Sequence, residues 1–84
     1  MKKYYICPIC GYDKLEEPPY DEFGEPSYEI CPCCGIEFGF DLENYHITQE
    51  EYRRKWINNG GEWFDPQEKP QKWDIRQQLK NVKK

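Results

Sequence analysis

Two copies of the motif Cys-Pro-x-Cys-Gly, followed by a helical pattern, predict a small α+β domain stabilised by a metal ion. The chain has 84 residues, which suits one domain and is too short for two. Chains of this size bury little apolar surface and usually need a disulfide, a metal ion or a partner. We therefore expect a single domain over residues 1–84. It comprises a cysteine-rich unit over residues 1–42 and a helical tail over residues 43–84 that packs on it.

The two cysteine turns share one spacing, as Cys7-Pro8-Ile9-Cys10-Gly11 and Cys31-Pro32-Cys33-Cys34-Gly35. In such a turn the first and fourth thiolates point toward one ion, while proline restricts the backbone and glycine accepts the turn. Four thiolates are a ligand set that tetrahedral zinc accepts. The predicted zinc ligands are Cys7, Cys10, Cys31 and Cys34. The fifth cysteine, Cys33, is a partly buried spare in this assignment, and the competing assignment has it replace Cys34.

Short extended segments flank each turn and predict a zinc-ribbon or rubredoxin-like arrangement on antiparallel strands. The first segment is residues 2–6 and the second is residues 28–30. In residues 36–40, apolar side chains alternate with small or polar ones, as they do in a half-buried strand. Residues 16–27 carry three prolines and predict a stiff loop whose Tyr20 and Phe23 fold back onto the core.

Two short helices are predicted in the tail. Thr48 and Glu51 form a capping box, which starts a helix near residues 49–59 that glycines end. A second helix is expected over residues 73–82, with Asp74 as its N-cap. The side chains expected in the core or at its rim are Tyr52, Trp56, Ile57, Trp63, Phe64, Trp73 and Leu79.

A closed four-thiolate site leaves no position for water or substrate, so the zinc is expected to be structural. The sequence carries no phosphate-binding loop, catalytic triad or open metal motif, and we expect no enzymatic activity. The single histidine, His46, precedes a helix cap and is expected on the surface.

Rubredoxin-like electron transfer on iron is an alternative, because Cys10-Gly11-Tyr12 resembles a rubredoxin turn. The twenty residues between Cys10 and Cys31 are fewer than is usual there.

Charge is divided unevenly along the chain. Residues 1–51 hold three Lys or Arg against twelve Asp or Glu, which gives a net charge of −9, whereas the net charge of residues 52–84 is +5.

No segment has the apolar length of a signal peptide or a membrane span, so we expect a cytoplasmic protein without membrane contact. A protein partner is expected at the acidic loop or an aromatic patch. Nucleic acid is an alternative that the acidic half disfavours; its candidate residues are Arg53, Arg54, Lys55, Lys72, Arg76, Lys80, Lys83 and Lys84.

Beyond the two turns, the chain resembles the cysteine-rich CPCC-type family of small, poorly characterised bacterial zinc-ribbon-like proteins. The matching stretches include residues 7–12 and 26–35, then 38–41, 53–57 and 60–64. The resemblance implies a zinc-stabilised module and brings no catalytic residues. Small acidic proteins of this kind occur in toxin-immunity and phage-conflict settings, and this analogy suggests an adaptor or inhibitor.

Overall fold

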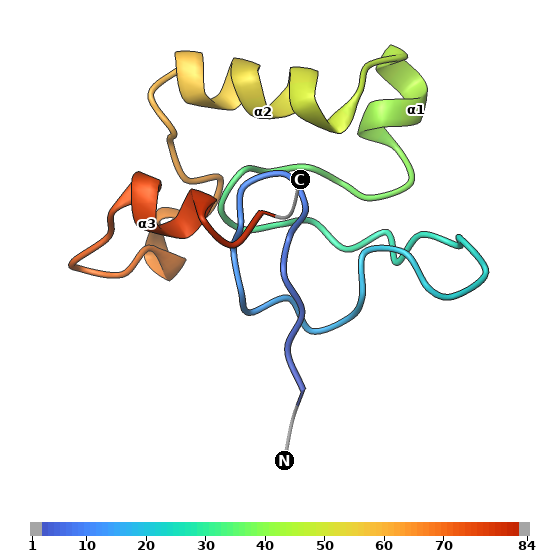
Figure 1. The fold of residues 1–84 in the computed structure, drawn as a ribbon, viewed down its shortest axis with the longest axis horizontal. Coiled ribbons are helices and arrows are strands. Elements are labelled where there is room, and N and C mark those ends of the chain that lie inside the picture. Colours follow the sequence, from blue (N-terminus) through green and yellow to red (C-terminus); the bar gives the residue numbers. More distant parts are fainter. Residues whose placement is uncertain (1–2, 83–84) are drawn as a thin grey trace.

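The computed structural model describes residues 3–82, in which short helices surround a largely non-helical N-terminal half (Figure 1). The helices are α1 (Asp41–Tyr45), α2 (Gln49–Asn58) and α3 (Ile75–Leu79), with a 3-10 turn, η1 (Pro66–Glu68), before α3. The segment formed by α1 and α2 runs along one side of the cysteine turns, and α3 lies near the end of α2 that is far from α1. No helix within residues 3–82 is long and apolar enough to cross a membrane.

The expected strands are reduced to isolated antiparallel bridges in the described residues. Tyr5 pairs with Leu15 beside the first turn, and Ile30 pairs with Glu37 beside the second. Each pairing ends after a few hydrogen bonds because the cysteine turn starts there. The half-buried strand predicted for residues 36–40 also stops early, since residues 38–40 form a turn and α1 begins at Asp41. The α+β prediction is therefore correct in its helices and wrong in its strands.

The predicted capping box of α2 is confirmed. The Thr48 hydroxyl accepts a hydrogen bond from the Glu51 amide, and the Glu51 carboxylate accepts one from the Thr48 amide, both at 3.1 Å. Helix α3 is shorter than predicted, but Asp74 caps it by accepting a hydrogen bond from the Arg76 amide. Helix α1 was not predicted, because its five residues carry neither a side-chain cap nor a buried side chain.

The buried core is small and nearly half of it is cysteine. Its members are Cys7, Ile9, Cys10, Leu15, Cys31, Cys33, Cys34, Ile36, Phe38, Trp56 and Trp63. The tail joins this core through edge-to-face aromatic contacts that run from Tyr12 to Trp63, Trp73 and Trp56, with ring centroids 5.5 to 6.3 Å apart. Such contacts stabilise a packed interface beyond the area that they bury.

Six other aromatic or aliphatic side chains expected at the core divide between the core and the surface. Tyr52, Trp73 and Leu79 are partly buried against the core, as expected. Ile57 and Phe64 are exposed, and so is Phe23, with 82% of its surface accessible. Phe23 lies in a tight turn that the Asp21 carboxylate closes by accepting from the Phe23 and Glu25 amides, and this turn directs the ring away from the core.

Candidate metal centre

The structure brings together the four cysteines that the sequence predicts as ligands. The sulfurs of Cys7, Cys10, Cys31 and Cys34 all lie within 4.8 Å of one another. The Cys7–Cys34 and Cys10–Cys31 sulfur pairs are 3.8 and 3.6 Å apart. Four sulfurs placed tetrahedrally at the Zn–S distance of about 2.3 Å would be about 3.8 Å apart. These four sulfurs are therefore close enough together to hold one metal ion.

The two turns are local copies of each other. In each, the amide of the first cysteine donates to the residue five positions on, and the glycine amide donates back to the first cysteine carbonyl. Gly11 and Gly35 adopt φ values of 86° and 80°, which only glycine takes without strain. A Cβ on Gly11 would also overlap the Gln78 carbonyl, so this glycine lets α3 approach the turn.

Side chains of the tail bind the backbone of the first turn. The Arg53 guanidinium donates from Nε to the Ile9 carbonyl at 2.6 Å and from a terminal nitrogen to the Pro8 carbonyl at 2.9 Å. The Gln78 side chain donates to the Cys10 carbonyl, and the Asn81 side chain donates to the Gly11 carbonyl, each at 3.0 Å. Every carbonyl from Cys7 to Gly11 thus has a donor.

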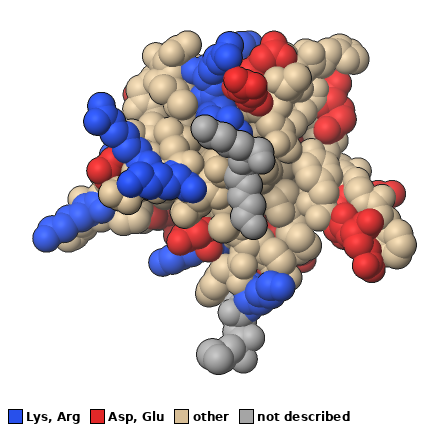
Figure 2. All heavy atoms as spheres, viewed as in Figure 1, with Lys and Arg blue, Asp and Glu red and all other residues tan. Residues whose placement is uncertain are grey.

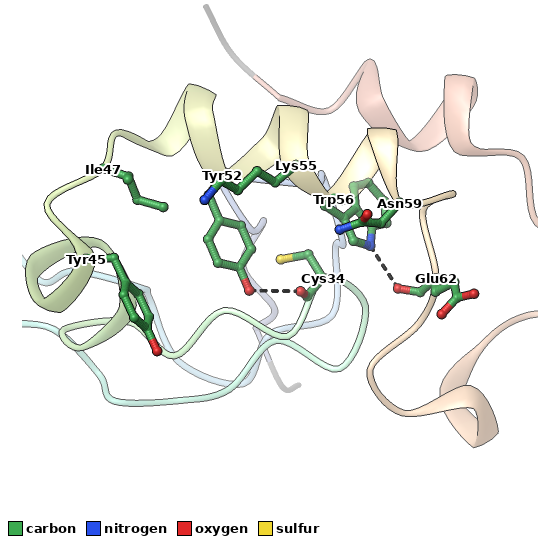
Figure 3. Close-up of a pocket in the computed structure, with 8 residues that line it drawn as sticks. All are labelled: Cys34, Tyr45, Ile47, Tyr52, Lys55, Trp56, Asn59 and Glu62. Carbon is green, nitrogen blue, oxygen red and sulfur yellow. Dashed lines mark hydrogen bonds between the residues drawn. The ribbon is translucent and has the colours of Figure 1, made fainter.

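The second turn is held in a similar way, mostly by backbone donors. The Asp65 and Phe64 amides donate to the carbonyls of Pro32 and Cys33. The Tyr52 hydroxyl donates to the Cys34 carbonyl at 3.2 Å, as Figure 3 shows. Burial first, and then the charge of Cys34, raise the pKa of Tyr52, so this phenol stays protonated as a donor. The tail therefore fixes the backbone that presents the sulfurs.

Protons are shared unequally within the sulfur cluster. Hydrogen bonds from Cys10, and then from Cys31 and Cys34, hold the pKa of Cys7 well below its usual range. The matching hydrogen bonds, first with Cys31, raise the pKa of Cys10. The charged form is thus favoured at Cys7 and disfavoured at Cys10. Binding a divalent cation to all four sulfurs would release the protons that the thiols carry.

The fifth cysteine lies next to the cluster but outside it. Cys33 is fully buried, and its sulfur accepts a hydrogen bond from the Gln78 amide nitrogen at 3.2 Å. The Gln78 oxygen in turn accepts from the Trp73 indole at 2.8 Å. Cys33 is thus more deeply buried than the partly buried spare that the sequence predicts. His46 caps the end of α1 in an exposed, left-handed conformation and contributes nothing to the cluster.

Sequence reasoning missed the residues that support the turns. It placed Arg53 with the basic side chains available to nucleic acid, whereas the guanidinium is partly buried against the first turn. It gave Gln78 and Asn81 no role. The hydrogen bonds of these residues join positions 44 to 70 apart in sequence, and no local pattern marks such contacts.

Two curated proteins of Bacillus subtilis (strain 168), YozI and YoaQ, align with nearly the whole chain. YozI is 32% identical over 96 aligned residues, covering 96% of this chain and 74% of its own length. YoaQ is 32% identical over 95 residues, covering 96% of this chain and 75% of its own length. Both are described only as uncharacterized proteins. No protein-family model and no solved structure matches the chain. Identity at this level over this length shows common descent, and the chain belongs to the family of YozI and YoaQ.

Proposed function

We propose that the chain is a zinc-stabilised protein-interaction module in which the metal is structural. The observation that carries this proposal is the closure of the four-sulfur cluster: three of the four cysteines are fully buried and the fourth is 8% exposed. The surrounding carbonyls already have donors, so the turns have little freedom to open a coordination position. A four-thiolate site without an open position stabilises a fold and does not activate a substrate. We accordingly propose a role without catalysis.

Zinc is the metal that we propose, with a zinc-ribbon arrangement of the CPCC type. Four thiolates also suit iron, and rubredoxin-like electron transfer is the competing reading. The short spacing between the turns and the helical tail that covers them support the structural role. The two metals differ in colour, since an iron site is red as purified and a zinc site is colourless.

The proposed partner surface is the acidic end, defined here as the side chains of residues 20–29 and 37–45. Exposed aromatic rings lie among its carboxylates, including Phe23, Tyr28 and Tyr45, which are 60–82% exposed. Figure 2 shows acidic side chains gathered on the side of this loop and basic ones mainly on the opposite side. Aromatic rings supply contact area, and the surrounding charge favours encounter with a basic partner. The partner that this chemistry suits is a protein with a basic surface, as expected of an adaptor or inhibitor.

Nucleic acid binding is left with fewer candidate residues than the sequence suggested. Arg53 binds the first turn, and Arg54 pairs with Glu50 at 2.9 Å. Lys83 and Lys84 lie outside the described residues. Lys55, Lys72, Arg76 and Lys80 stay available to this second reading, which a titration with duplex and single-stranded DNA at low salt would test.

Co-purification from the native host, followed by mass spectrometry, tests the proposed function. The unmodified chain should retain a partner protein in stoichiometric amount. The double variant Phe23→Ser, Tyr28→Ser should lose this partner. The control Ile57→Ser removes an exposed apolar side chain from α2, outside the acidic end, and should retain the partner. Recovery of nucleic acid without a protein, or equal recovery with all three chains, would contradict the proposal.

A further inference from the structure

A groove of about 500 Å³ lies between α2 and the second cysteine turn. We call it the α2 groove; Tyr52 and Trp56 form its apolar walls, and Lys55 and Asn59 lie at its edge. The polar tips of both aromatic walls are already bonded, to the carbonyls of Cys34 and Glu62. The two walls that these rings form are therefore apolar, while Tyr45, Lys55, Asn59 and Glu62 add polar groups to the lining.

Cys34 also lines this groove (Figure 3). It is the one cysteine among the described residues with measurable exposure, at 8%, whereas Cys7, Cys10, Cys31 and Cys33 are at 0%. In Figure 3 its sulfur points toward the ring of Tyr52, on the underside of α2. A reagent small enough to enter the groove thus meets Cys34 before the four other cysteines.

We propose that Cys34 is a modification site through which small peroxides, entering by the α2 groove, open the four-cysteine cluster. This inference stands apart from the proposed partner surface, and it rests on the zinc site of the proposed function. It also rests on the accessibility of Cys34 from the groove and on the short distance between its sulfur and that of Cys7, because oxidation of a cysteine requires exposure to the oxidant.

The reaction balances with hydrogen peroxide as the only oxidant. The Cys34 thiolate attacks one peroxide oxygen, the O–O bond breaks, and hydroxide leaves, which gives a sulfenic acid on Cys34. The Cys7 sulfur, 3.8 Å away, then attacks the Cys34 sulfur as a thiolate and expels a second hydroxide. The two sulfurs lose two electrons in all, and peroxide is reduced to two hydroxides. Only Cys10 and Cys31 then keep free thiolates, too few for a four-coordinate site.

Differential alkylation tests the proposal on the zinc-loaded full chain. The protein is treated with substoichiometric hydrogen peroxide, remaining thiols are alkylated, and each cysteine-containing peptide is quantified by mass spectrometry. Released zinc is followed in parallel with a chromogenic chelator. We expect Cys34 to lose its free thiol first, together with Cys7, and zinc release to follow at the same rate. Loss at Cys33 or Cys10 before Cys34, or equal loss at all five, would overturn the proposal.

A matched pair of variants tests the route of entry. Asn59→Trp puts a large side chain at the groove, and Asn58→Trp makes the same change one residue earlier, at an exposed position that does not line it. We expect Asn59→Trp to slow zinc release several-fold and Asn58→Trp to leave it unchanged. Equal rates in the two variants would show that peroxide does not use the groove. Circular dichroism shows whether both fold, and the order of oxidation in the unmodified chain stands whatever their outcome.

Discussion

At the scale of single residues, Arg53 links the helical tail to the first cysteine turn. Its guanidinium is a fixed fork of donors, and two of them meet the adjacent carbonyls of Pro8 and Ile9. Those carbonyls belong to the two residues between Cys7 and Cys10, so Arg53 holds the backbone that joins the two cysteines. Hydrogen bonds from a charged donor are stronger than those from a neutral donor, so the two Arg53 contacts stabilise this backbone more than a neutral side chain would.

Replacing Arg53 with methionine should destabilise the zinc-loaded protein by about 2 kcal/mol, because two partly buried carbonyls lose a charged donor. Urea unfolding followed by tryptophan fluorescence measures the change. The matched control is Arg54→Met, which removes only an exposed pair with Glu50 and should cost at most about 0.5 kcal/mol. Equal losses in the two variants would show that the Arg53 contacts contribute little.

Cysteine substitutions separate the four cluster residues from Cys33. Cys33→Ser should keep one zinc per chain, since the Cys33 sulfur lies outside the cluster and only accepts a hydrogen bond from Gln78. Cys31→Ser should lose zinc and cooperative folding, because it removes one of the four converging sulfurs. Elemental analysis of the purified chains measures the metal. Zinc loss from Cys33→Ser with zinc retained in Cys34→Ser would move the ligand role to Cys33.

At the scale of secondary structure, local signals predicted helices better than strands. The capping box of α2 and the N-cap of α3 each depend on residues within three positions, and both formed as predicted. The strands failed because each pairing has room for only a few hydrogen bonds beside a cysteine turn. Ile57 and Phe64 fit an apolar pattern, yet burial depends on how the tail docks, which sequence spacing does not specify.

Removing the cap hydroxyl tests how much α2 depends on its own start signal. Thr48→Ala should lower the free energy of unfolding by about 1 kcal/mol, because the Glu51 amide loses its acceptor. Thr48→Ser keeps the hydroxyl oxygen, so its free energy of unfolding should stay close to that of the unmodified chain. Thermal unfolding by circular dichroism distinguishes the two. An unchanged midpoint in Thr48→Ala would mean that docking onto the turns alone holds the helix.

At the scale of the whole molecule, the two cysteine turns and the tail stabilise each other. The cluster, both glycines of the turns and the helical residues that cover them meet in one small core. The sequence allowed the four cysteines that cluster in the structure to be predicted, because the spacing of the turns is local and repeated. It did not reveal that tail donors cover the turn carbonyls, since each such contact joins distant segments.

Metal removal should therefore disorder more than the turns. A strong chelator should abolish the near-ultraviolet circular dichroism of Trp56, Trp63 and Trp73, which contact one another edge to face, and added zinc should restore it. Lower pH should have the same effect, because protons compete with the metal for the thiolates and zinc release rises as pH falls. A metal-free chain that keeps its aromatic signal and unfolding midpoint would show that the core does not need the metal.

X-ray absorption at the metal edge, with metal content measured on the same sample, tests the central claim most directly. One zinc per chain with four sulfur neighbours at about 2.3 Å is the predicted result, matching the four converging cysteines. A substoichiometric metal, or a first shell with nitrogen or oxygen in place of one or more sulfurs, would contradict the account.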